Sequence, residues 1–518
     1  MFSQIADGNI YINNDTTWSN TVIVDGNVFI DSNVILTIMP GTFVNITGYY
    51  AFYCHGTIKA LGTKLQPITF THLDTLMHSD TSTTKGGWHG IRILSRSIND
   101  TSVFKYCTIT NGKAVVPGSW VPYDAYPDNL GGSIYALDFG SIIIKHCTIS
   151  NNIATSHGGG IYLKNGHYVL IDSSEFSYNR AHWNYGGGAA IWEIDTLVIS
   201  NNLFYKNIAF NFFEGWSGGD GGAIAISHGL GYSCPASVFN NRFYNNKAIG
   251  GILFDSYYNS NVYNNIICNN SGIGLFNSHC FNFPIYKNNT IANNIAIPPS
   301  GVFSCSDAGS KKIFVNNIVW NNLSYIINDP DQFDWWPPET PPIVIFGDIM
   351  FGFEGKGNID TDPMFVNPTE GCGLDYDALE ADWSLRDDSP LVNAGVPDTT
   401  GWNIPATDFY GNPRIYGIRI DIGAIENQNV LVSSPNIQDK QAEWVIYPNP
   451  SQNEFRVKSS PNVNNAFITL YDLTGRVLKK AAVQNQTPVS VKQIKPGIYF
   501  YKITRGNKIL KTGKWIKQ

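Results

Sequence analysis

Residues 264–270 read NNIICNN, and residues 288–294, one repeat later, read NNTIANN. The unit is built on an Asn, an apolar residue two positions on, and a further Asn three positions after that. Its apolar positions are spaced by 40, 27, 28, 39, 24, 24 and 28 residues. They are Ile109, Ile149, Phe176, Phe204, Phe243, Ile267, Ile291 and Val319. The second Asn is present in seven of the eight units, and only Gly112 departs from it.

Short runs of β-branched and aromatic residues lie between these units, such as residues 142–144 (III) and 169–171 (VLI). Gly and Asn separate the runs, and no segment keeps a helical apolar period of 3.6 residues. A unit of 24 to 28 residues with about three short strands is one coil of a parallel β-helix. Such coils stack at the strand spacing of ~4.8 Å.

The repeated Asn side chains have a structural explanation. On stacked coils they form a ladder inside the helix or at a turn, where each amide bonds the next and tolerates left-handed backbone. Cys107 and Cys147 occupy equivalent positions, two before the apolar residue, so they should lie on adjacent coils. We expect stacked, buried thiols there, although a disulfide also fits.

The composition excludes several classes of protein. Only 14% of the 518 residues are charged, which argues against disorder, a coiled coil and a mostly helical fold. No apolar run approaches the ~18 residues of a membrane span. The net charge of −7 is uneven: residues 440–518 hold 14 Lys and Arg against 3 Asp and Glu, which leaves the rest at −18. Such an acidic body repels polyanions, so we expect no nucleic-acid partner.

The eight cysteines include no C-x-x-C motif and no Cys/His cluster at zinc spacing, so we expect no zinc framework. Cys280 and Cys305 fall at similar points of adjacent coils and are a candidate extracellular disulfide. The start, MFSQ, lacks the basic and apolar regions of a signal peptide. Either the protein stays inside the cell, or residue 1 is internal to a longer precursor.

Two groups of motifs carry a family resemblance over residues 1–426. Residues 36–42 (LTIMPGT), 56–63 (GTIKALGT), 67–71 (PITFT) and 87–91 (GWHGI) resemble the opening coils of secreted bacterial right-handed parallel β-helix proteins. Residues 357–365 (GNIDTDPMF), 389–395 (SPLVNAG) and 421–426 (DIGAIE) resemble the closing region of the choice-of-anchor Q family. We therefore expect β-helix coils over 1–330 and a closing region over 331–426. The resemblance implies export and does not imply a reaction.

A separate module follows a polar linker, which we place at 427–440. Residues 441–518 alternate apolar and polar positions in short runs, a pattern that predicts an antiparallel sandwich of about seven strands. Residues 447–450 (YPNP), 470–476 (LYDLTGR), 495–499 (KPGIY) and 508–514 (KILKTGK) are similar to a type IX secretion C-terminal sorting domain of type A.

The second resemblance implies passage through the outer membrane of a Bacteroidota-type bacterium and recognition by the type IX secretion machinery. In most members of that family the module is then removed. Because this route begins with ordinary inner-membrane export, we expect the start of the chain to be internal to a longer precursor or to have been trimmed.

Four loops are predicted to leave one edge of four consecutive coils, because each ends at a Gly-Gly pair that re-enters a strand. They are residues 113–130, 153–157, 180–185 and 208–220. Loops on one edge of a solenoid form its usual binding face, and aromatic rings suit the C–H faces of sugars. We predict a glycan-binding groove here, the alternative being aromatic residues that pack the loops against the helix. The predicted ligand-binding residues are Trp120, Tyr135, Tyr162, Trp183, Trp192 and Trp216.

Catalysis has weaker support. The motif set of polygalacturonase-like hydrolases is missing apart from an isolated Asp387–Asp388 pair and Ser-His-Gly at 156–158 and 227–229. A lyase would need a base beside a uronate carboxylate and a cation or calcium ion to neutralise that carboxylate. The candidate catalytic residues are Lys164, Arg180, His182 and Glu214, and the candidate calcium ligands are Glu193, Glu214 and Asp220, without a supporting spacing signature. Aspartates between residues 360 and 388 are interpreted as turn caps rather than as a calcium site.

The sequence thus predicts an all-β, secreted or outer-membrane-surface protein: a right-handed parallel β-helix followed by a small antiparallel β-sandwich. Non-catalytic binding of a glycan or a surface ranks first. A polysaccharide lyase that acts on a uronate-containing polymer ranks second. No cofactor is assigned, and calcium is the one candidate.

Overall fold

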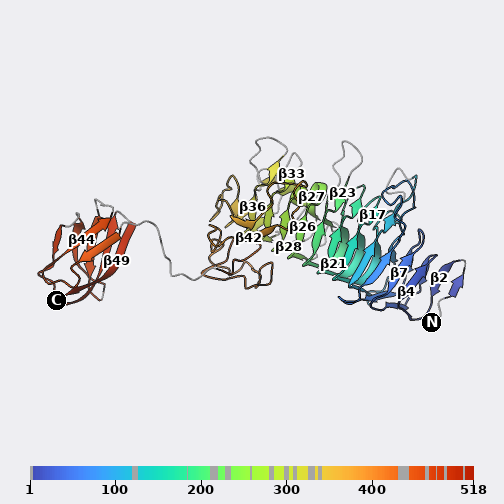
Figure 1. Cartoon of the computed structure of the whole chain (residues 1–518), viewed down its shortest axis with the longest axis horizontal. Coiled ribbons are helices and arrows are strands. Elements are labelled where there is room, and N and C mark those ends of the chain that lie inside the picture. The colour runs from blue at the N-terminus through green and yellow to red at the C-terminus, as the bar shows by residue number, and fades with distance from the viewer. Residues whose placement is uncertain are drawn as a thin grey trace. The chain divides into compact units, whose positions relative to one another are not determined.

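The computed structural model contains two compact units, Met1–Leu431 and Val432–Gln518, which are described separately. The structure describes residues 4–6, 8–118, 126–183, 185–210, 220–227, 235–256, 259–278, 285–296, 303–306, 312–324, 333–336, 341–429, 443–460, 466–473, 475–483, 487–505 and 508–518. Every regular element in these ranges is a β-strand (Figure 1), so the all-β prediction is confirmed.

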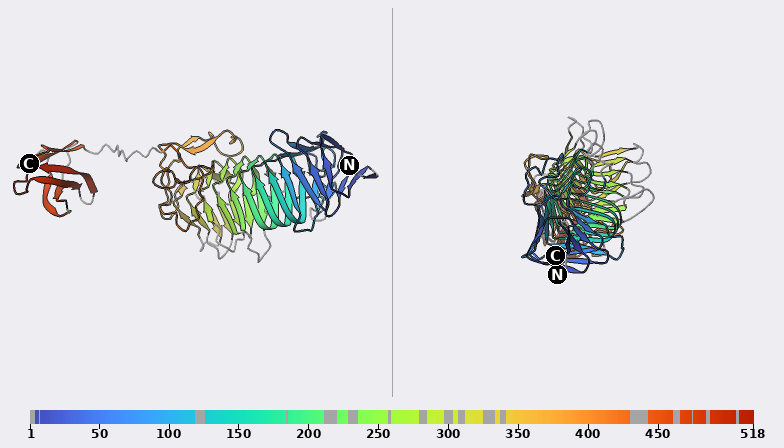
Figure 2. Two further views of the ribbon diagram at one scale, coloured as in Figure 1. Left: turned by 90° about the horizontal axis from the view of Figure 1, so that it is seen from below. Right: turned by 90° about the vertical axis from the view of Figure 1, so that its right-hand side faces the viewer.

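One coil of the first unit illustrates the others. The long strand β18 (Ile161–Asp172) is followed by β19 (Glu175–Ser177) and β20 (Arg180–Ala181). Ser173 and Tyr178 adopt left-handed backbone at the two turns, with φ of 52° and 55°. Each strand pairs in parallel with its equivalent one coil away, so the coils stack into a parallel β-helix (Figure 2).

Within the described residues one sheet runs along a single side of the helix as twelve parallel strands. They are β4 (Thr21–Val24), β7 (Phe43–Ile46), β10 (Ile68–Thr71), β13 (Cys107–Thr110), β16 (Thr148–Ser150), β19, β22 (Leu203–Tyr205), β26 (Arg242–Tyr244), β29 (Ile266–Cys268), β32 (Thr290–Ala292), β36 (Ile318–Trp320) and β40 (Asp348–Ile349). We refer to it as the short-strand sheet.

The remaining sides form one continuous hydrogen-bonded sheet. A first row contains β2 (Asn9–Ile12), β5 (Val28–Ile30), β8 (Phe52–Cys54), β11 (Ile91–Ile93), β15 (Ile134–Lys145), β18, β21 (Ala189–Ser200), β24 (Ile224–Ser227), β27 (Lys247–Ser256), β30 (Ser271–Ser278), β34 (Phe303–Ser306) and β38 (Phe333–Trp336). A second row contains β3 (Thr16–Trp18), β6 (Ile35–Ile38), β9 (Thr57–Leu61), β12 (Thr101–Lys105), β25 (Pro235–Phe239), β28 (Asn259–Tyr263), β31 (Ile285–Lys287), β35 (Ile313–Val315) and β39 (Ile343–Ile345). Short strands after the short-strand sheet are β14 (Lys113–Ala114), β17 (Ile153–Ala154), β20, β23 (Ile208–Ala209), β33 (Ile295–Ala296) and β37 (Leu323–Ser324). At the N-terminal end β1 (Gln4–Ala6) pairs antiparallel with β2.

Stacked apolar side chains fill the helix interior, because every strand points alternate residues inward. Phe176, Phe204 and Phe243 are fully buried and stack on consecutive coils, with ring centroids 5.0 and 5.1 Å apart. These rings are the apolar positions of the sequence repeat. The repeat unit is therefore the short strand with the two turns that flank it.

The second Asn of each repeat forms a buried ladder. Asn207 accepts hydrogen bonds from the backbone N (3.1 Å) and Nδ2 (2.9 Å) of Asn179. Its own Nδ2 donates to Phe176 O at 2.7 Å and to Asn246 Oδ1 at 3.0 Å. The same pattern joins Asn152, Asn179, Asn207, Asn246, Asn270, Asn294 and Asn322.

A second ladder occupies the turn before each short strand. Its asparagines are Asn202, Asn241, Asn265, Asn289 and Asn317, linked coil to coil in the same way. Ser174, Cys147 and Cys107 continue it toward the N-terminus, where Cys147 N donates to Ser174 Oγ (3.0 Å) and Cys107 N to Cys147 Sγ (3.4 Å). Both thiols are free and buried, as expected. Cys280 and the side chain of Cys305 lie outside the described residues.

The chain after β40 folds back over the outer face of the short-strand sheet. Trp383 and Ala378 pack there on Tyr244, Ile266 and Cys268. We define residues 351–429 as the closing segment, which includes β41 (Phe365–Asn367) and β42 (Asp382–Leu385). Asn side chains at the left-handed turn positions hold it by hydrogen bonds to its backbone, namely Asn245, Asn264, Asn269, Asn293 and Asn316.

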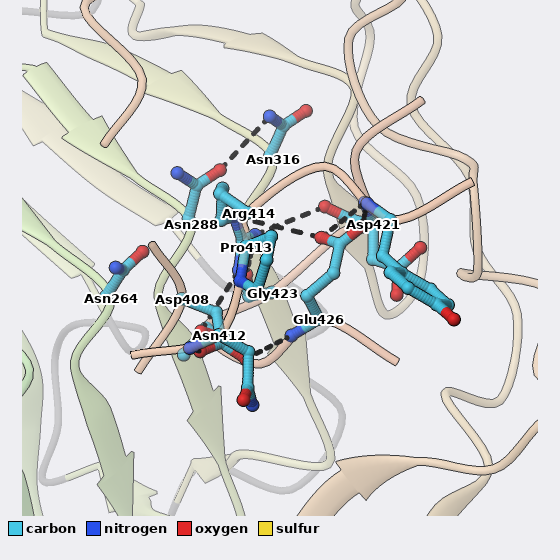
Figure 3. A network of polar contacts seen from close by, with 12 residues as sticks. Asn264, Asn288, Asn316, Asp408, Asn412, Pro413, Arg414, Asp421, Gly423 and Glu426 are labelled. Atoms are coloured by element: carbon cyan, nitrogen blue, oxygen red, sulfur yellow. Dashed lines mark hydrogen bonds and ion pairs between the residues drawn. The ribbon is translucent and has the colours of Figure 1, made fainter. Parts of the chain in front are cut away.

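A buried polar network closes the end of this segment (Figure 3). Arg414 is 1% exposed, and its guanidinium donates to Ala424 O at 3.1 Å and to Gly423 O. Glu426 lies 3.9 Å from Arg414 Nε and accepts the N–H of Asp421 at 3.1 Å. Paired burial of this kind stabilises the segment only while every polar group keeps its partner.

The second unit has its own core around Trp515 and Phe455. One antiparallel sheet contains β43 (Glu443–Tyr447), β44 (Glu454–Ser460) and β47 (Pro488–Ser490). The other contains β46 (Val477–Val483), β45 (Ala466–Tyr471), β48 (Gly497–Arg505) and β49 (Lys508–Lys517). This agrees with the antiparallel, seven-strand expectation for the module.

Candidate functional site

Three of the six aromatic residues predicted to bind a ligand, Tyr135, Tyr162 and Trp192, form a packed layer beside the helix. Tyr135 and Tyr162 are each only 3% exposed and stack with ring centroids 5.7 Å apart. Trp192 contacts Tyr162 edge-on at 5.2 Å. The side chains point away from the helix core, as period-two alternation predicts, but Tyr135 and Tyr162 are covered and Trp192 is half-buried. This is the packing arrangement that the sequence left open as the alternative.

His157 lies in the middle of this layer. Its Nε2 is 2.7 Å from Tyr126 Oη, and its Nδ1 accepts the N–H of Tyr185 at 3.3 Å. Burial lowers the pKa of His157 to about 3, so the ring is neutral and structural at physiological pH. The Ser-His-Gly motif at 156–158 therefore belongs to the packing of the layer.

The other predicted residues are dispersed. Lys164 and Glu193 form a half-exposed ion pair at 3.6 Å. Burial, followed by the charge of Arg180, lowers the pKa of His182 to about 4. Trp183 and Asp220 are half-buried. Trp120, Glu214 and Trp216 lie outside the described residues. Within the described part of the chain, no three His, Cys, Asp or Glu side chains are grouped to hold a metal ion.

Of the catalytic candidates that the structure describes, Arg180 lines a groove on the helix surface. The groove has a volume of about 440 Å³ and runs beside the turn that follows the short-strand sheet. Its lining residues are His78, Asn151, Ile153, Tyr178, Arg180, Lys206, Ile208, Asn245, Lys247 and Leu374. We call it the cationic groove, because three of these side chains are positively charged and none of its described lining residues is acidic.

The floor of the groove is one stacked position of the β-helix. Ile153, Arg180, Ile208 and Lys247 pair in register on β17, β20, β23 and β27. Since coils are ~4.8 Å apart, the two cations of this column lie about 10 Å from each other, with an isoleucine between them. Tyr178, which is 48% exposed, lies at the turn before β20.

The N-terminal wall comes from residues 73–87. Lys113, the next member of the same column, donates from Nζ to Met77 O (2.8 Å), Asp80 O (2.9 Å) and Lys85 O (2.7 Å). His78 bridges the loop to the helix, with its ring nitrogens 2.8 Å from Gly86 O and from Asn151 O. The loop is therefore anchored through backbone carbonyls, which fix its shape.

The opposite wall belongs to the closing segment. Asp377 Oδ2 accepts from Tyr205 Oη at 2.6 Å and from Lys206 Nζ at 3.0 Å. Burial raises the pKa of Asp377, but the hydrogen bonds from Tyr205 and Lys206 outweigh it and the net pKa is lowered. Lys206 is thereby partly neutralised, whereas Arg180 and Lys247 form no ion pair with any described carboxylate. Lys247 instead lies over the Phe210 ring at 5.6 Å.

Sequence reasoning selected Arg180 but missed the groove. The usable signal was the residue directly after Gly112 and after the ladder residues Asn152, Asn179, Asn207 and Asn246, because Lys113, Ile153, Arg180, Ile208 and Lys247 alternate cation and isoleucine there. The repeat does not predict the two walls of the cationic groove. They are formed by residues 73–87 and 374–377, which come from distant parts of the chain.

Two family models agree with this architecture. Residues 79–328 match the family model described as the right handed beta helix region, and residues 445–518 match the secretion system C-terminal sorting domain. The crystal structure of pectate lyase Pel9A aligns with a TM-score of 0.37 and 14% identity over 75% of this chain and 88% of that one. No curated protein matches the chain significantly. Within the described residues there is also no helix long and apolar enough to span a membrane. The chain thus joins a right-handed β-helix region to a secretion sorting domain and is a secreted or cell-surface protein.

Proposed function

We propose that this protein binds an acidic polysaccharide outside the cell and that the cationic groove is its binding site. The observation that carries the proposal is the cluster of Arg180, Lys206 and Lys247 in one groove of an otherwise acidic body. Cations gathered against the overall charge raise the local concentration of anionic ligands. We also infer, from the resemblances alone, a closing region of the choice-of-anchor Q type and a Bacteroidota-type host.

The lining chemistry suits a charged sugar polymer. Arg180 presents a planar guanidinium, which binds carboxylates in a bidentate manner. Ile153, Ile208 and Tyr178 provide apolar surface for C–H faces, and Asn151 contributes amide groups for hydroxyls. Because Arg180 and Lys247 are about 10 Å apart on one column, they can contact two separate acidic sugar units of one polysaccharide chain.

Affinity electrophoresis and calorimetry with polygalacturonate, alginate and neutral polysaccharides would test the proposal. We expect the wild-type protein to retain at least one acidic polymer and to lose affinity as salt rises, because the contacts are ionic. Arg180→Gln should weaken that binding about tenfold, the value of one charge-assisted hydrogen bond. Arg96→Gln removes an exposed arginine outside the groove and should leave binding unchanged. Equal binding by the Arg180 variant and wild type would refute the site.

The same incubations would test the alternative, a polysaccharide lyase. Appearance of unsaturated oligosaccharides would make the groove a catalytic centre, and Arg180 would be the first base to examine. A retained but uncleaved polymer would establish a binding module.

A further inference from the structure

The unpaired cations of the cationic groove lie on alternate coils. Arg180 and Lys247 occupy the same stacked position of the β-helix, with Ile208 on the coil between them. Neither cation forms an ion pair with a carboxylate in the described part of the chain. Arg180 and Ile208 are half-buried, and Lys247 is exposed. Three consecutive coils therefore present a cation, an apolar side chain and a cation to solvent.

The same column offers a ligand no further cation on the neighbouring coils. Ile153, one coil before Arg180, is only 3% exposed. Lys113, one coil earlier again, is fully buried and donates its ammonium hydrogens to three backbone carbonyls of the N-terminal wall. On the other side, the partner of Lys247 is the buried Ser271. The accessible part of the column thus begins at Arg180 and ends at Lys247.

The middle coil carries a lysine whose charge is already compensated. Lys206 lies at the left-handed turn before β23, two residues ahead of Ile208. Its Nζ donates to Asp377 Oδ2 at 3.0 Å and lies 4.7 Å from the centre of the Tyr205 ring. An acidic group above Ile208 would have to compete with the carboxylate of Asp377 for this ammonium group, whereas a neutral sugar unit would not.

The coil spacing matches the length of a sugar unit. Coils are ~4.8 Å apart, and a pyranose in an extended chain advances the chain by roughly the same distance. A ligand that runs parallel to the column therefore places one unit over each coil. Arg180 and Lys247 then bind the acidic groups of alternate units, and the aliphatic side chain of Ile208 contacts the C–H face of the unit between them.

We infer that the cationic groove selects a polysaccharide whose acidic units alternate with neutral ones, and that three such units lie along Arg180, Ile208 and Lys247. The inference rests on the proposed function and adds the substrate class. A groove that bound its ligand by charge alone would instead prefer a polymer with a carboxylate on every unit, because ionic attraction grows with the charge of the ligand. The two explanations predict opposite orders of affinity.

Calorimetry at one ionic strength with two oligosaccharides of equal length tests the inference. A hyaluronan octasaccharide carries a carboxylate on every second unit, and an oligogalacturonate of the same length carries one on every unit. We expect hyaluronan to bind about threefold more tightly, the scale of one exposed charge contact, although it has half as many charges. Arg180→Gln and Lys247→Gln should each weaken hyaluronan binding about tenfold.

Two variants change the middle coil. Asp377→Asn keeps the shape of the side chain and releases Lys206 from its ion pair, so it should strengthen oligogalacturonate binding about threefold and change hyaluronan binding little. Asp375→Asn removes an exposed carboxylate of the same segment, which pairs with no described cation, and is the matched control. Ile208→Lys places a new cation on the middle coil and should act like Asp377→Asn without altering the closing segment.

The outcomes separate the two claims. Suppose that oligogalacturonate binds as tightly as hyaluronan, that hyaluronan does not bind, or that neither middle-coil variant changes the ratio of the two affinities. The alternation is then overturned, and the groove stands as long as Arg180→Gln weakens binding of an acidic polymer. If Arg180→Gln binds acidic polymers as wild type does, the proposed function itself fails. Thermal midpoints show whether each variant is folded, and should Asp377→Asn loosen the closing segment, Ile208→Lys decides the question.

Discussion

Single asparagines determine how the coils of this β-helix stack. Asn207 is fully buried and uses its amide for four hydrogen bonds to the coils before and after it. A ladder requires a side chain that donates hydrogen bonds to one neighbouring coil and accepts them from the other. The short, uncharged amide of Asn does both.

Asn207→Ala should lower the free energy of unfolding by about 3 kcal/mol. The variant leaves the backbone N–H of Asn179 without its acceptor and Phe176 O without its side-chain donor, and each unsatisfied buried group costs roughly 1–3 kcal/mol. Urea denaturation followed by circular dichroism would measure the change. Asn14→Ala, at an exposed site, is the control and should stay within about 0.5 kcal/mol of wild type. If Asn207→Ala lowered the free energy of unfolding no more than Asn14→Ala does, the stabilising role of the Asn ladder would be contradicted.

Asp348 makes stability depend on pH. It is fully buried, only its Oδ1 has a hydrogen-bond partner among the described residues, and burial raises its pKa from 3.8 to about 8. The folded chain therefore holds a proton that the unfolded chain releases above about pH 4. Stability is highest below that pH and falls as pH rises toward 8.

Asp348→Asn should remove this part of the pH dependence. The variant keeps the shape of the side chain without an ionisable group, so it should gain stability relative to wild type at pH 8 and not at pH 4. Denaturant midpoints of both proteins across this range would show it. Parallel curves for the two proteins would mean that Asp348 does not titrate in the window.

At the scale of elements, a single lysine attaches a long loop to the β-helix in place of strand pairing. Residues 73–87 contain no strand, and Lys113 binds three of their carbonyls. Loops held by few contacts open locally without global unfolding.

Lys113→Met should release this loop while the helix stays folded. We expect faster tryptic cleavage after Lys85 and little change in the cooperative unfolding midpoint. Lys59→Met, on the outer face of β9, removes a lysine elsewhere and should not alter the cleavage rate. Unaltered cleavage of the Lys113 variant would show that His78 and the rest of the loop suffice to hold it.

At the scale of the whole molecule, the sorting domain directs export. Deletion of residues 441–518 removes the region that matches the sorting family and should leave the protein in the periplasm. Fractionation of cells that express full-length and truncated chains would measure this. Normal release of the truncated chain would contradict a role of the module in secretion.

The sequence by itself determined the coils, the Asn ladders, the placement of Cys107 and Cys147 on adjacent coils and the sorting domain, and the structure then decided that both thiols are free. These features are local or strictly periodic, so each coil predicts the next. Only the tertiary structure decided the site. Tyr135 and Tyr162 alternate outward as expected, yet the layer around His157 buries them. Arg180 lines a groove because Lys113 and Asp377 hold two distant segments beside it. Contacts between segments this far apart depend on chain folding in three dimensions, which no repeat pattern encodes.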